Sequence, residues 1–157
     1  MTVLVRPAEP QDAALICEFL WALAEQSELP AKVGVADVSR LFFGAGPHVF
    51  SDIAMADGEA IGFSTWFYDV DTFAGAKGIH LEDLYVRPQA RGSGAGLALM
   101  SALARRCRDE GLASLEWSVL PANASALAFY GHLGATPKSG WITQRLWGAP
   151  LAALADR

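Results

Sequence analysis

Apolar positions recur along this 157-residue chain with two periods, and these divide it into strands and helices. A period of three to four residues predicts helices over 10–26, 35–43, 97–108 and 125–133. Short, mostly apolar runs predict strands over 3–5, 49–56, 60–68, 81–86, 114–120 and 141–147. The order is βααββ followed by βαβαβ. It predicts an α/β fold in which a mixed sheet carries helices on both faces.

Composition and net charge limit the classes of protein to which this chain can belong. Hydrophobic residues make up 52% and charged residues 18%, which is typical of a folded chain, and the length predicts a single domain over residues 1–157. The net charge of −5 argues against a nucleic-acid surface. It suits a cationic substrate, although solubility alone explains it equally well. Cys17 and Cys107 form no metal or redox motif, so we expect a reduced, cytoplasmic setting. No stretch predicts a membrane span.

A glycine-rich turn joins the strand over 81–86 to the helix over 97–108. It reads Arg91-Gly92-Ser93-Gly94-Ala95-Gly96. Alternating glycines leave backbone N–H groups open at a helix start, where the aligned peptide dipoles favour an anion, and Arg91 adds a positive charge. The turn therefore predicts a pyrophosphate cradle.

Other interpretations of the turn stay open. A dinucleotide-binding motif would close with a glycine, whereas positions 97 and 99 are leucine; Glu116 does lie about 20 residues on, as that motif requires. The chain has no Gly-Lys-Ser/Thr for a Walker loop. A glycine connection that serves only close packing would need neither Arg91 nor the long helix.

The turn and its surroundings carry a family resemblance. The turn fits the Q/R-x-x-G-x-G/A pattern of GCN5-related N-acetyltransferases (GNAT), and Asn123, Ala128-Phe129-Tyr130 and Leu133-Gly134-Ala135 resemble that family's "N…A..FY..LGA" segment. Leu81-Glu82-Asp83-Leu84-Tyr85-Val86 resembles the diamine (spermidine/spermine) N-acetyltransferase branch. The resemblance implies the GNAT fold, with a mostly antiparallel central sheet, and acetyl-CoA as co-substrate, with no metal.

The resemblance also implies the residues that bind the cofactor. Backbone groups of Leu84, Tyr85 and Val86 would pair with the pantetheine arm as an added strand does. The turn would hold the pyrophosphate. Asn123 and Tyr130 would also contact the cofactor. Asn123 could instead be only a helix N-cap, and the two roles are compatible.

Acetyl transfer to an amine needs a base for the ammonium and an acid for the departing thiolate. Glu82 is the candidate base, because it lies in an apolar strand where desolvation raises a carboxyl pKa. The alternative is a buried carboxylate paired with an arginine. Tyr130 is the candidate acid, since a phenol has a pKa comparable to that of a thiol. Strand alternation predicts that Glu82 and Asp83 point to opposite faces.

Glu82, Asp83, Trp141 and Glu28 are the candidate residues for binding the substrate, although Trp141 could equally be a core residue. The polyamine enzymes carry a tyrosine–acid pair where this chain has Gln26-Ser27, so a shorter diamine or a lysine-like amine fits as well. Trp66-Phe67-Tyr68 with the following aspartates could line an alkylammonium pocket or pack in the core. His80, directly before the strand over 81–86, is a further candidate for lining the site.

These observations predict an N-acetyltransferase that moves the acetyl group of acetyl-CoA to a small cationic primary amine by direct attack in a ternary complex. Family resemblance implies a homodimer. We expect no nucleic-acid or membrane partner. The alternatives are a non-catalytic acetyl-CoA sensor or partner-binding module, and an oxidoreductase that binds NAD(P).

Overall fold

The computed structural model describes residues 2–140 and 142–157. Their internal contacts divide the chain into two compact units, residues 1–118 and residues 119–157, and each is described by itself. The α/β architecture with a mostly antiparallel sheet is confirmed. A single domain across 1–157 stays a prediction.

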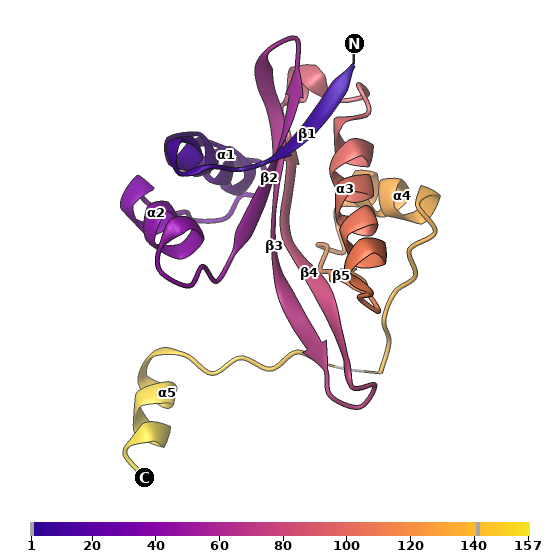
Figure 1. The fold of residues 1–157 in the computed structure, drawn as a ribbon. Coiled ribbons are helices and arrows are strands. Elements are labelled where there is room, and N and C mark those ends of the chain that lie inside the picture. The colour runs from indigo at the N-terminus through magenta and orange to yellow at the C-terminus, as the bar shows by residue number, and fades with distance from the viewer. Residues whose placement is uncertain (1, 141) are drawn as a thin grey trace. The chain divides into compact units, whose positions relative to one another are not determined.

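The first unit is built on one five-stranded sheet with the order β1-β2-β3-β4-β5 (Figure 1). The strands are β1 (Val3–Pro7), β2 (Phe50–Ala56), β3 (Glu59–Asp71), β4 (Ala76–Val86) and β5 (Leu115–Trp117). Neighbours pair antiparallel except β4 and β5, which pair in parallel through Ile79–Leu81 and Leu115–Trp117. The β2–β3 hairpin turns at Asp57-Gly58, as predicted, and both residues have positive φ. The strand predicted over 114–120 is shorter than expected.

The pairing of β3 with β4 contains one irregularity, and it falls on the predicted catalytic strand. Thr65 pairs with Asp83 and Trp66 with Leu81, so Glu82 is an extra residue without a partner on β3. This two-against-one arrangement is a β-bulge. Toward the C-terminal end of β4, the strands β3 and β4 lie close together, since a Cβ on Gly62 would come 2.6 Å from the Tyr85 carbonyl oxygen.

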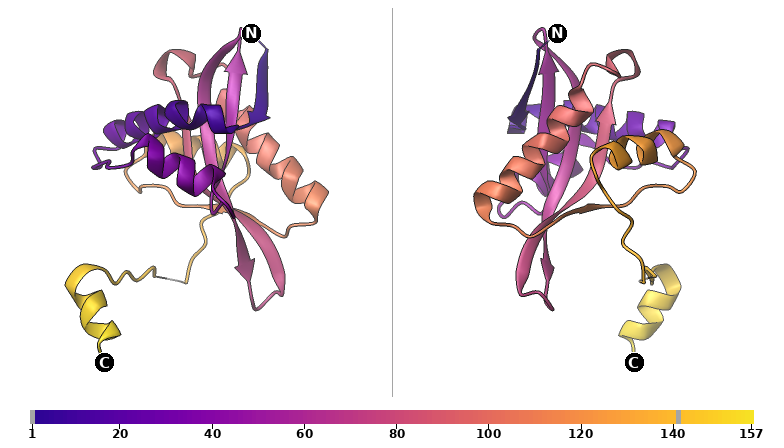
Figure 2. Two further views of the ribbon diagram at one scale, coloured as in Figure 1. Left: turned by 60° about the vertical axis from the view of Figure 1, so that its left-hand side comes forward. Right: turned by 90° about the vertical axis from the view of Figure 1, so that its right-hand side faces the viewer.

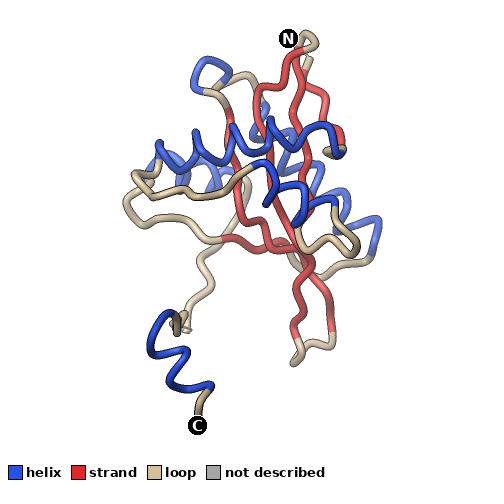
Figure 3. The backbone as a smooth tube through the Cα atoms, turned by 90° about the vertical axis from the view of Figure 1, so that its left-hand side faces the viewer, coloured by secondary structure: helices blue, strands red, loops and turns tan. Residues whose placement is uncertain are grey.

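Two helices cover one face of the sheet, α1 (Ala13–Gln26) and α2 (Val35–Phe43), as Figures 2 and 3 show. A 3-10 turn, Pro10–Asp12, precedes α1, and Arg6 anchors it through a salt bridge of 2.7 Å to Asp12. Ile16 and Phe19 of α1 are fully buried, and Phe19 stacks on Phe63 of β3. The helix predicted over 35–43 has the observed bounds, and the one predicted over 10–26 corresponds to the 3-10 turn followed by α1.

The opposite face carries α3 (Ala95–Glu110), which ends at Gly111 with φ +67, as predicted (Figure 2). A 3-10 turn, Pro88–Ala90, leads from β4 toward it. Trp66 is buried under this helix, with its indole N–H donating to Asp52 at 2.8 Å and the Arg106 guanidinium over its ring at 4.7 Å. Tyr68 donates to Glu110 at 2.7 Å. Trp66 and Tyr68 therefore pack with α3 and do not form the alkylammonium pocket considered above.

The second unit holds α4 (Ala124–His132) and α5 (Gly148–Ala155). The helix predicted over 125–133 is confirmed, and Asn123 caps it by accepting the Ala126 N–H at 3.0 Å. The strand predicted over 141–147 is wrong, because 142–147 lie in no strand, and Trp141 lies outside the described residues. α5 was not predicted. Among the described residues, no helix combines the length and apolar character needed to span a bilayer.

Candidate active site

The β4 bulge brings Glu82 and Asp83 to the same face of the sheet. Asp83 accepts a 2.5 Å hydrogen bond from the Thr65 hydroxyl, which places it on the face covered by α1 and α2. The Glu82 carboxylate lies 3.7 Å from Nε2 of His80, whose ring stacks on Phe67 of that face. The prediction of opposite faces is therefore wrong. Regular alternation fails where a strand carries an extra residue.

The two carboxylates differ in environment. The Glu82 side chain is 60% exposed, so the expected desolvation of Glu82 is wrong. Asp83 is the desolvated group: burial raises its pKa above the ordinary value, the Thr65 hydrogen bond offsets part of this rise, and the Glu82 charge adds to it. The Glu82–Arg pair considered as an alternative is not found in the ion pairs of the described residues, where Glu82 faces His80.

The free edge of β4 follows directly after the carboxylates. The Arg87 N–H donates to the Ile61 carbonyl of β3. In an antiparallel pair every second residue bonds to the partner strand, so Tyr85 also bonds toward β3. The N–H and C=O groups of Leu84 and Val86 therefore point away from β3. Among the described residues, β5 pairs with β4 only as far as Leu81. Leu84 and Val86 thus offer an edge for an added strand. The predicted backbone role fits these two residues. It does not fit Tyr85, because its backbone groups bond toward β3, and its buried ring packs on Phe19.

The glycine turn has the backbone that anion binding requires. Gly92 and Gly94 have φ values of +77° and +89°, and α3 begins at the next residue, Ala95. Its first helical hydrogen bond is donated by Ala98 to Gly94, which leaves the N–H groups of Ala95 and Gly96 without helical acceptors. The Ser93 hydroxyl is buried and has no hydrogen-bond partner within the described chain. A pyrophosphate would satisfy these groups, so the turn fits the predicted cradle.

Arg91 is held beside this turn. Its Nε donates to the Val86 carbonyl at 3.3 Å, and its guanidinium also donates to the Gln26 side-chain oxygen at the end of α1. Gln26 was considered only as a departure from the polyamine enzymes. The structure gives it a role that the sequence did not indicate, since it fixes the cation next to the cradle.

Tyr130 and Asn123 belong to the second unit. Tyr130 lies on α4, its ring 5.3 Å from that of Phe129, and burial raises its pKa above the ordinary value. A phenol in this environment stays protonated at neutral pH, as an acid must. The predicted capping role of Asn123 at the start of α4 is confirmed, whereas its contact with the cofactor stays a prediction.

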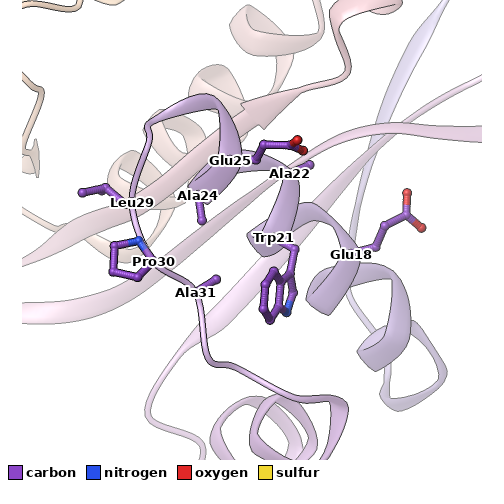
Figure 4. Close-up of a pocket in the computed structure, with 8 residues that line it drawn as sticks. All are labelled: Glu18, Trp21, Ala22, Ala24, Glu25, Leu29, Pro30 and Ala31. Atoms are coloured by element: carbon purple, nitrogen blue, oxygen red, sulfur yellow. The ribbon is translucent and has the colours of Figure 1, made fainter.

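Glu28 lies just beyond α1, exposed and with φ +55°. The next residue, Leu29, lines a hollow formed by α1 and the loop that follows it (Figure 4). None of the hollow's lining residues is a predicted site residue: Glu18, Trp21, Ala22, Ala24, Glu25, Leu29, Pro30 and Ala31. No group of three or more His, Cys, Asp or Glu in the described part of the chain could hold a metal ion.

Comparison with known proteins decides the family. The model of the Acetyltransferase (GNAT) family matches residues 15–135. The chain belongs to the GNAT family. It is accordingly an acetyl-CoA-dependent N-acetyltransferase.

Two relatives and one solved structure illustrate the match. A thialysine N-epsilon-acetyltransferase from Bos taurus is 30% identical over 99% of this chain and 98% of its own length. One from Caenorhabditis elegans is 38% identical over 66% of each chain. An integron cassette protein from the mobile metagenome of V. cholerae has the same fold, with a TM-score of 0.82 at 23% identity over 100% of this GNAT chain and 99% of its own.

The raised pKa of Asp83 predicts a pH-dependent stability. The folded state holds this proton more tightly than the unfolded state, so the contribution of Asp83 to stability falls as pH rises from the ordinary aspartate range through the raised pKa. Asp83→Asn removes the titrating carboxyl. The free energy of unfolding of this variant relative to wild type should therefore increase as pH rises from the ordinary aspartate range through the raised pKa. Urea unfolding at a series of pH values measures the difference.

Asp37→Asn is the matched control with the opposite sign. The Gly34 N–H and then Arg40 lower the pKa of Asp37, so its contribution is present at neutral pH and lost in acid. The Asp37→Asn variant should lose stability relative to wild type as pH rises. Parallel pH profiles for wild type and Asp83→Asn would show that Asp83 is not desolvated.

Proposed function

We propose that this enzyme acetylates the primary amine of a small cationic substrate, a diamine or a lysine-like amine such as thialysine. One observation carries the proposal: the bulge gives β4 two carboxylates on one face, immediately before a free strand edge and a glycine turn. The carboxylates suit an ammonium group, and the edge and turn suit the co-substrate. The relatives described above, named for thialysine, support the substrate class.

In this proposal the first unit binds the co-substrate through its backbone. Leu84 and Val86 pair with the pantetheine arm, and the turn residues hold the pyrophosphate: Gly92, Ser93, Gly94, Ala95 and Gly96. Arg91, fixed by Gln26, contributes charge. Bound acetyl-CoA supplies an acetyl thioester. Asp83, Glu28 and Trp141 remain proposed substrate contacts.

Glu82 and Tyr130 divide the proton transfers. Glu82 accepts a proton from the ammonium, directly or through water, because an alkylammonium with a pKa near ~10.4 is almost fully protonated at neutral pH. The freed nitrogen forms a bond to the acetyl carbon within a ternary complex, and the bond from carbon to sulfur breaks. Tyr130 gives its proton to the departing thiolate. Solvent then restores both residues.

The exposure of Glu82 suits exchange with solvent. A 60% exposed carboxylate reaches water, so the proton that it accepts can leave without a buried relay. Asp83 is partly buried and already accepts a hydrogen bond from the Thr65 hydroxyl, so we assign it a substrate contact and assign the proton transfer to the exposed Glu82.

The remaining expectations belong to the proposal. They are a homodimer, a cytoplasmic setting, and no nucleic-acid or membrane partner. Cys17 and Cys107 are free thiols in the structure, which is compatible with a reducing compartment.

Thiol release from acetyl-CoA tests the proposal directly. Putrescine, spermidine, lysine, thialysine, an aromatic amine and an aminoglycoside form the panel, and we expect release with thialysine or a diamine. Release only with the aromatic amine or aminoglycoside would overturn the substrate class. No release, with acetyl-CoA still raising the melting temperature, would favour a sensor.

Replacing Tyr130 by phenylalanine should lower kcat by roughly 10²–10⁴ if Tyr130 is the acid. Tyr68→Phe is the control, since the Tyr68 hydroxyl donates to Glu110 of α3 and lies outside the proposed machinery. Steady-state kinetics with the best amine measure both. A loss under about threefold for Tyr130→Phe would remove the acid role.

Replacing Glu82 by glutamine should lower kcat/KM by about 10² at pH 7. The deficit should shrink as pH approaches the pKa of the amine, because free amine needs no base. Glu59→Gln, which changes an exposed carboxylate at the start of β3, should match the wild type. If the pH profiles of Glu82→Gln and wild type run parallel, Glu82 is not the base.

A further inference from the structure

His80 lies within the carboxylate cluster of β4 and has no part in the proposed reaction. Its ring is stacked on Phe67, with centroids 5.0 Å apart and planes 24° from parallel, and its Nε2 lies 3.7 Å from the Glu82 carboxylate. The side chain is 27% exposed, so solvent protons reach it. The stacking holds the imidazole at Glu82, the predicted base.

We propose that His80 sets the pH range in which Glu82 is available to the cationic amine. When the imidazole is neutral, the Glu82 carboxylate is free to bind the ammonium. When it is protonated, it pairs with Glu82 and also repels the substrate, so amine binding weakens as pH falls. Imidazole is the side chain that ordinarily changes charge between pH 5 and 8. The inference rests on the proposed function, because it concerns how the same amine binds.

The ionisable groups that neighbour His80 on the described strands are acidic. On the same face, β4 contributes Glu82 and Asp83, β3 contributes Asp69, whose carboxylate lies over Gly78, and β5 contributes Glu116, which is beside His80 in the register. From α1, Phe19 packs on Tyr85 of β4, and Glu18 forms an ion pair with Arg87 just beyond the strand. These carboxylates attract both the cationic substrate and an imidazolium, so the two cations compete for one cluster.

Equilibrium binding of thialysine between pH 8 and pH 5.5 tests the inference without turnover. Its side-chain amine, the group to be acetylated, remains largely protonated over this range, so a change in Kd chiefly reports titration of the protein. In wild type with bound coenzyme A, we expect Kd to rise about two- to fivefold toward pH 5.5, as for a solvent-exposed ion pair. In His80→Phe, which keeps an aromatic ring against Phe67, most of this rise should disappear, and protonation of Asp83 accounts for what remains.

Two further variants complete the design. His48→Gln alters an exposed histidine in the loop after α2 and should keep the wild-type pH dependence. Glu82→Gln removes the partner of His80 and should bind thialysine more weakly with little pH dependence. Circular dichroism confirms that each variant is folded.

The outcomes separate the inference from the function on which it rests. A wild type that binds thialysine equally at both pH values overturns the inference alone, as does a His80→Phe variant that keeps the wild-type rise. Failure to bind thialysine at any pH, with acetyl-CoA still bound, overturns the lysine-like substrate and the inference together. Loss of most of the rise in both His80→Phe and Glu82→Gln, with His48→Gln unchanged, establishes it.

Discussion

The site depends on the pairing of β3 with β4 and on the single residue by which that pairing is interrupted. On one side of the bulge Gly62, Phe63 and Ser64 pair with Val86, Tyr85 and Leu84, which fixes the free edge of β4. On the other side Trp66 and Phe67 pair with Leu81 and His80. Glu82 lies between the two registers. Its position relative to both the edge and His80 follows from this one irregularity.

The bulge also explains why two adjacent carboxylates have different properties. Asp83 keeps a partner on β3 and accepts the Thr65 hydrogen bond in a desolvated environment, whereas Glu82 has no partner strand and its side chain reaches water. Burial disfavours the charged form of an acid, and exposure permits rapid exchange with solvent. A shared face with unequal solvation gives the two residues different properties: Asp83 is held in place by Thr65, and Glu82 can exchange its proton with water.

Much of the fold could be predicted from the sequence, because local patterns determine it. The periodicity of α1 and α2, the Asp57-Gly58 hairpin and the Gly111 terminus of α3 all depend on neighbouring residues. The glycine turn was predictable for the same reason. The orientation of Glu82 was not, because a bulge arises from how two distant strands pair. Nor was the contact between Gln26 and Arg91, which are 65 residues apart in the chain. The strand predicted over 141–147 had a suitable apolar pattern, but a pattern does not supply a partner strand.

A bulge is a difference in length between two paired strands, so the chemistry of this site depends on the number of residues in β4 as well as on their types. Deleting Glu82 would leave Asp83 opposite Thr65 and Leu81 opposite Trp66 in unbroken register. Every neighbouring side chain could keep its identity while one carboxylate vanished and the strand straightened. Enzymes built on this sheet could therefore gain or lose an acid–base group through the insertion or deletion of a single codon, with no change to the residues on either side.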